Sequence, residues 1–211
     1  MKGKLLKNNW KSYLAVFLCG ILAGVGTRLT DYCGADTLWS FSSIATLYGF
    51  WIISVTVIVL LSTSNLCAGV CSFLYLFGMT LSFYGLLYVL GLYLPRFHND
   101  GFQTSLFLMY TGLSACCGIG AALLYVWERN TRIGAVLYAL PVAALLAESV
   151  GTGIYLINRS TFLFQFLMDI LAAVIFGVLF FKRTAHKGIY GVSVFLGTAA
   201  VYMLIYRPNL P

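Results

Sequence analysis

The chain has 211 residues, of which 61% are hydrophobic and 9% are charged, with a net charge of +7 and a mean hydropathy of +0.91. A soluble domain has about 25% charged residues, so this composition excludes a soluble globular protein. The apolar stretches are continuous over about 20 residues, as membrane-spanning helices require, and lack the alternation of a β-barrel. We therefore expect an all-α integral membrane bundle, with residues 1–211 forming a single polytopic transmembrane domain.

Seven transmembrane helices are predicted in chain order, over residues 10–27, 43–61, 66–94, 104–126, 133–157, 161–181 and 188–206. The third run exceeds the ~20 residues needed to cross, so it is expected to tilt, to bend near Gly78 or Gly85, or to form two segments. Pro141 is expected to kink the fifth helix. Gly20 and Gly24 form a small-x3-small pattern, which is typical of close helix packing.

Basic residues predict the orientation of the chain in the membrane. With the N-terminus inside, nine of them lie in inner segments and four in outer segments, as the positive-inside rule requires. The inner ones are Lys2, Lys4, Lys7, Lys11, Arg129, Arg132, Lys182, Arg183 and Lys187, and the outer ones are Arg28, Arg96, Arg159 and Arg207. Seven spans then place the C-terminus outside. This distribution assigns the net charge to topology, so no nucleic acid is expected as a partner.

The first span follows four lysines, like a signal peptide, but no small-x-small cleavage site follows, so it is interpreted as an uncleaved anchor. Five of the six cysteines fall in the predicted spans or at their edges, which does not indicate a disulfide framework. Cys67 and Cys71 share a helix face, yet no His or carboxylate accompanies them at the spacing of metal ligands. Neither a metal nor a cofactor is expected.

Two carboxylates interrupt the apolar runs of the fifth and sixth spans. An acid in hydrocarbon costs at least ~2.5–3.5 kcal/mol, so it is rarely left without a partner, a proton or a water-filled cavity. Glu148 lies nine residues before the outer end of the fifth span, and Asp169 lies eight residues after the outer start of the sixth. At 1.5 Å per residue these depths are ~13 Å and ~12 Å, which predicts two acids at one level.

Polar residues extend from each acid toward the outer side at helical spacing, and the third span has a similar stripe. These stripes predict a polar cavity that opens outward. The residues expected to bind a substrate or ion are Glu148, Asp169, Gln165, Thr152, Tyr84 and Thr80. No residue is assigned a catalytic role.

Two acids close together in a low dielectric cannot both ionise cheaply, so one is expected to keep a proton. This suits proton exchange, cation capture or recognition of an amine-bearing solute, and it favours a small transporter or a transport-complex subunit. The alternative is a non-transporting partner or scaffold, in which the acids join helices through hydrogen bonds or pair with Arg28 or Arg159. An intramembrane enzyme ranks third, since the sequence has no His-Glu-x-x-His motif or nucleophile–base set. Without a nucleotide-binding motif, transport would need an ion gradient, passive flow or a partner ATPase.

The stretch Asp36-Thr37-Leu38-Trp39-Ser40-Phe41-Ser42-Ser43, which leads into Gly49-Phe50-Trp51, resembles a segment of small bacterial polytopic membrane proteins. The resemblance covers the first three spans at most and implies no activity. It suggests a bacterial cytoplasmic membrane as the location. Within this stretch, Asp36 is expected to cap the start of a helix.

Overall fold

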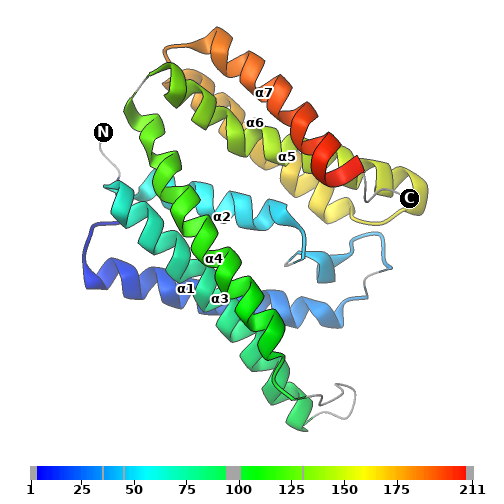
Figure 1. Cartoon of the computed structure of the whole chain (residues 1–211). Coiled ribbons are helices and arrows are strands. Elements are labelled where there is room, and N and C mark those ends of the chain that lie inside the picture. The colour runs from blue at the N-terminus through cyan, green and yellow to red at the C-terminus, as the bar shows by residue number, and fades with distance from the viewer. Residues whose placement is uncertain (1–3, 35, 45, 94–100, 130, 208–211) are drawn as a thin grey trace. The chain divides into compact units, whose positions relative to one another are not determined.

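The computed structural model describes residues 4–34, 36–44, 46–93, 101–129 and 131–207, and this part of the chain is helical, without β-strands. Six spans are long and apolar enough to cross a membrane (Figure 1). They contain α1 (Trp10–Leu29), α3 (Asn65–Tyr93), α4 (Thr104–Leu124), α5 (Arg132–Arg159), α6 (Leu163–Arg183) and α7 (Lys187–Val201). A shorter apolar helix, α2 (Tyr48–Leu61), has 14 residues. The prediction of an all-α fold is confirmed for the described residues, and their six long apolar helices are compatible with a membrane protein.

The start of α2 differs from the sequence prediction. No helix begins at Asp36, and the α-helix starts only at Tyr48, after a 3-10 turn over Phe41–Ser43. Hydroxyl groups account for the delay: Ser43 Oγ donates to the Ser40 carbonyl (2.6 Å), and Thr46 Oγ1 donates to the Ser43 carbonyl (3.0 Å). Such local bonds compete with the helical ladder, so an apolar run that contains them need not be helical throughout.

The long third run is one helix of 29 residues, and neither Gly78 nor Gly85 interrupts it. Helix α5 likewise continues through Pro141 over 28 residues. At its C-terminal end α7 passes into a π-helical turn, Tyr202–Tyr206.

The helices form two compact units. The first contains residues 1–30 and 57–125, and in it α1 and α4 both pack against α3 (Figure 1). The second contains residues 31–56 and 126–211, and in it α6 and α7 both pack against α5. Helix α2 begins in the second unit and ends in the first.

Glycines bring α1 directly onto α3 in the first unit. A Cβ at Gly20 would collide with the Tyr75 carbonyl oxygen, and one at Gly24 with the Met79 carbonyl oxygen. On α3, which faces α1, a Cβ at Gly78 would lie 2.7 Å from the Phe17 carbonyl oxygen of α1. The small-x3-small pattern therefore serves close packing of two helix backbones, as predicted.

Three chain segments meet at one end of the first unit. The Leu6 amide, ahead of α1, donates to the Leu61 carbonyl (3.0 Å), and the Thr63 amide donates to the Leu6 carbonyl (3.1 Å). The hydroxyl of Tyr125, just after α4, donates to the Thr63 carbonyl (2.7 Å) and accepts from Lys4 Nζ (2.6 Å). The N-terminal segment, the α2–α3 connection and the end of α4 thus lie together.

In the second unit, the connection between α1 and α2 lies against the α5–α6 hairpin. The Leu163 amide donates to the Leu38 carbonyl (3.0 Å), and the Phe162 amide donates to Ser40 Oγ (3.2 Å). The rings of Phe41 and Phe164 lie 5.1 Å apart between centroids. These contacts anchor the non-helical segment that leads into α2.

We expect Gly24→Ala to lower the stability of the first unit by about 1–3 kcal/mol, because the new methyl group must push α1 away from the α3 backbone. Gly26→Ala, on the same helix, is the matched control, since a Cβ there meets no atom within 4 Å. Thermal unfolding of the purified variants measures the difference. Equal melting temperatures for the two variants would contradict the packing role of Gly24.

Candidate functional site

Both predicted acids are completely buried in the second unit. Glu148 on α5 and Asp169 on α6 are each 0% exposed, and Gln165, one turn before Asp169, is 1% exposed. A tight hairpin joins the two helices, with left-handed backbone at Ser160 (φ 52°) and Phe162 (φ 66°). The two carboxyl groups are close enough for the charge of Glu148 to act on Asp169.

The ends of the two helices at the hairpin differ from the predicted ones. Helix α5 extends to Arg159 and α6 begins at Leu163, so Glu148 is ~16 Å and Asp169 ~9 Å from the hairpin ends of their helices. Both bounds lie two residues later in the chain than predicted. Gly153 faces Phe166 and Gly177 faces Val142, a register of α5 and α6 in which Glu148 and Asp169 lie within ~3 Å of one level. The first turn of α2 contacts both acids.

Gly49, in the first turn of α2, lies directly against the Asp169 carboxyl. A Cβ at position 49 would collide with Asp169 Oδ1 and would lie 2.8 Å from Gln165 Nε2, so no residue larger than glycine fits without a shift. The backbone amides at Gly49 and Tyr48 also face Glu148. Because the first amides of a helix lack internal acceptors and carry partial positive charge, they stabilise a nearby carboxylate.

Tyr206 approaches the acids from the π-helical turn after α7. Its ring packs against Gly151, where a Cβ would lie 2.9 Å from the ring Cδ1. Its hydroxyl lies close to Glu148, and the charge of Asp169 also reaches it. π-helical turns are rare and often occur at functional sites.

The site has more acceptor oxygens than donors. Gln165 Nε2 donates to Asp169 Oδ1 over 3.4 Å, a long hydrogen bond. Among the residues that the structure describes, no group completes a hydrogen bond to Glu148 Oε1 or Oε2, to Asp169 Oδ2 or to Gln165 Oε1. The amides of α2 and the Tyr206 hydroxyl therefore lie near Glu148 without satisfying it. Buried polar atoms normally have partners, so four unsatisfied oxygens in one place are an exception that calls for an explanation.

Thr152 lies on the same helix as Glu148 and is buried, but its hydroxyl donates to the Glu148 carbonyl (2.9 Å) and the Ser149 carbonyl (3.3 Å) of its own helix. Thr80 and Tyr84 are buried on α3, in the first unit. The ring of Tyr84 packs among aromatic neighbours there, which are Phe83, Phe107 and Tyr110. That Thr80 and Tyr84 line one substrate path together with the two acids stays a prediction. Arg28, considered above as a partner for an acid, lies over the Phe83 ring at 5.2 Å.

Sequence reasoning missed Gly49, Tyr48 and Tyr206. No periodic signal marks the first two, because their role depends on where α2 starts. Gly151 was detectable in principle, because it follows Glu148 by three residues and so lies on the same helix face.

Comparison with known proteins adds no family to this description. No family model, no curated protein and no solved structure matches the chain. The function therefore has to be inferred from the chemistry of the buried oxygens.

We expect Gly49→Ala to destabilise the second unit, because its methyl group collides with the Asp169 carboxyl. In a double-mutant cycle, Asp169→Ala should recover part of this loss, since it removes the atom with which the methyl group collides. Thermal unfolding of the two single variants and the double variant measures the coupling. Strictly additive losses of stability in the two single variants would show that residue 49 and Asp169 are not in steric contact.

Proposed function

We propose that this protein is a multi-pass membrane transporter, or a membrane subunit of a transport complex, that binds a small cation or protonatable solute at Glu148 and Asp169. The observation that carries the proposal is the set of four buried acceptor oxygens from Glu148, Asp169 and Gln165 that no described group satisfies. A proton, a monovalent metal ion or an ammonium group supplies the positive charge or donors that such a set lacks.

The surroundings of the two acids support a shared proton or cation. Glu148 faces the amides of α2 and the Tyr206 hydroxyl without completing a hydrogen bond to either oxygen. Asp169 accepts from the Gln165 amide and feels the charge of Glu148. Because burial penalises the charged form of both acids, we propose that they hold one proton or cation between them.

The late start of α2 supports a transport role over a purely structural one. Non-helical backbone at membrane depth is tolerated where protein buries it or where it lines a water-filled cavity. In secondary transporters, discontinuous helices of this kind build the binding site with their ends. Here the end of α2 contacts both acids.

We further propose seven crossings, with the N-terminus inside, the C-terminus outside and the cavity open to the outside. Helix α2 is ~21 Å long, and its first turn lies against Asp169, ~9 Å along α6 from the hairpin end. These two lengths together match the ~30 Å of a hydrocarbon core. The hydrogen bonds also support it, because segments predicted to lie inside contact one another, as do two segments predicted to lie outside.

The alternative is a non-transporting membrane partner or scaffold subunit of a larger complex. The contact between Glu148 and the first amides of α2 favours it, since a carboxylate there stabilises a helix that begins inside the bundle. It does not explain why Asp169 Oδ2 and Gln165 Oε1 are buried without partners. In either case we place the protein in a bacterial cytoplasmic membrane, with other membrane subunits or an ATPase as partners in a transport complex.

Labelling with a membrane-impermeant thiol reagent tests the topology. In a variant that keeps only Cys33, we expect labelling from outside, and in a cysteine-free variant with Ala185→Cys we expect labelling only from inside. Position 99 is also expected to be labelled from outside, but it is not among the described residues. Reversed accessibility at either position would overturn the orientation derived from the basic residues.

Asp169→Asn tests the site, because it keeps shape and hydrogen bonding but removes the charge. We expect the variant to fold with modest loss of stability and to lose stabilisation by bound cations. The measurement is the melting temperature of the purified protein in titrations with sodium, potassium and methylammonium chloride. In the native protein the stabilisation should fall as the pH falls, because protons compete for the same oxygens.

Asp36→Asn is the matched control, since Asp36 is exposed in a turn far along the chain from either acid. It should behave like the native protein in every titration. An Asp169→Asn variant that binds as before, or that does not fold, would show that Asp169 is not the functional acid.

A further inference from the structure

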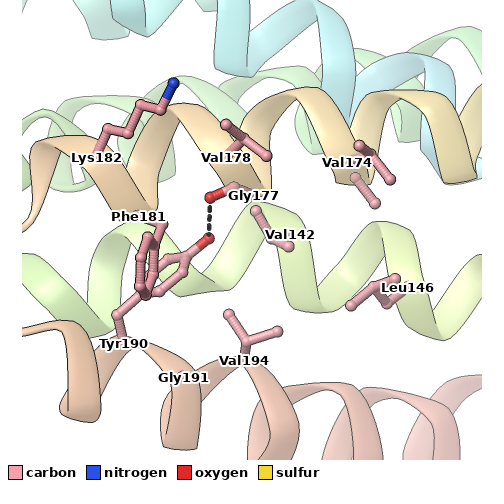
Figure 2. A pocket seen from close by; sticks show the side chains of 11 residues that line it. Val142, Leu146, Val174, Gly177, Val178, Phe181, Lys182, Tyr190, Gly191 and Val194 are labelled. Carbon is pink, nitrogen blue, oxygen red and sulfur yellow. Dashed lines mark hydrogen bonds between the residues drawn. The ribbon is translucent and has the colours of Figure 1, made fainter.

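A groove of about 500 Å³ runs along the second unit, between α6 and α7 (Figure 2). Val142 and Leu146 of α5 form its floor, and α6 and α7 form its walls (Figure 2). Small residues open it: Gly177 lies on the α6 wall and Gly191 on the α7 wall, and a Cβ at position 191 would meet no atom within 4 Å. The volume is within the ~300–1,000 Å³ range of ligand sites in proteins.

The groove continues along α7 into a second hollow of about 350 Å³. The two hollows share Leu146, Gly191 and Val194, and the second extends as far as Tyr202. From Tyr190 to Tyr202 the distance along the helix is ~18 Å. Half of the ~30 Å hydrocarbon core is ~15 Å, which is the depth that one lipid acyl chain spans. The groove therefore has the length of an acyl chain.

Among the residues that line the two hollows, a positive charge occurs at one end. Lys182, at the end of α6, is the one charged residue among those that line either hollow in the described chain. Lys187, at the start of α7, holds its ammonium group 5.2 Å from the ring of Phe181, which also lines the groove. At the same end the Tyr190 hydroxyl donates to the Gly177 carbonyl (3.2 Å), so its polar group is already satisfied (Figure 2).

We propose that the groove binds one acyl chain of an anionic phospholipid, with the lipid phosphate at Lys182. The long apolar floor and walls match the chain, and the single cationic end matches the headgroup. Basic pockets between transmembrane helices are known to recognise anionic headgroups in this way. A soluble phosphate would use the Lys182 end alone and would leave the apolar length without a role.

Native mass spectrometry of the full-length protein in detergent, with added phosphatidylglycerol or phosphatidylcholine, tests the proposal. We expect the native protein to retain the anionic lipid about fivefold more than the zwitterionic one, the effect of one cation near a headgroup. Lys182→Gln should abolish this preference, and Lys182→Arg should keep it. Lys11→Gln, which changes a lysine in the first turn of α1, is the control for general loss of charge.

A second variant fills the groove instead of changing its charge. Gly191→Leu should lower retention of both lipids several-fold, because its side chain occupies the space of the acyl chain. Gly112→Leu on α4 is the matched control, since a Cβ there also meets no atom within 4 Å. Glycerol phosphate, which has the headgroup chemistry without the chain, should not displace the lipid.

Three results would overturn the proposal. Equal retention of the two lipids by the native protein would remove the role of Lys182. Retention by Gly191→Leu at the level of Gly112→Leu would place the lipid elsewhere. Displacement by glycerol phosphate would show an anion site without a chain site. The Lys182 variants change an exposed side chain, so they remain informative even if Gly191→Leu does not fold.

Discussion

The central constraint on the second unit is the cost of holding two carboxyl groups in an apolar interior. Each acid costs at least ~2.5–3.5 kcal/mol at that depth unless the protein compensates it. The compensation comes from the first turn of α2, from Gln165 and from Tyr206. It is incomplete, because three of the four carboxyl oxygens have no hydrogen-bond partner among the described residues. An incomplete compensation costs stability, and a protein retains such a cost most readily where a ligand or a proton removes it.

The start of α2 follows from the same constraint. Because α2 begins at Tyr48, its first amides face Glu148. The residues before it satisfy their own backbone through serine and threonine hydroxyls and through contacts with the α5–α6 hairpin. Gly49 then allows the helix to approach Asp169 more closely than any other residue would. The short helix α2, the polar turn before it and Gly49 thus act together to compensate the two buried acids.

The sequence was sufficient for the features that depend on local pattern. The six long helices, the uninterrupted third run and the glycine contacts of α1 with α3 follow from hydropathy, length and residue size. The shared face of Gln165 and Asp169 on α6 follows from helix periodicity. The position of α2 and the approach of Tyr206 do not, because they depend on contacts between residues far apart in the chain: Gly49 and Asp169 are 120 positions apart, and Glu148 and Tyr206 are 58.

Helix α5 connects the acid site with the apolar groove. Val142 and Leu146, one turn apart, face the groove, whereas Glu148 lies about 200° around the helix from Leu146. Helix α7 also takes part in both, since it supplies Gly191 and Val194 to the groove and leads into the turn that carries Tyr206. If occupation of one of the two proposed sites shifts α7, thermodynamic linkage requires that each site change the affinity of the other by the same factor.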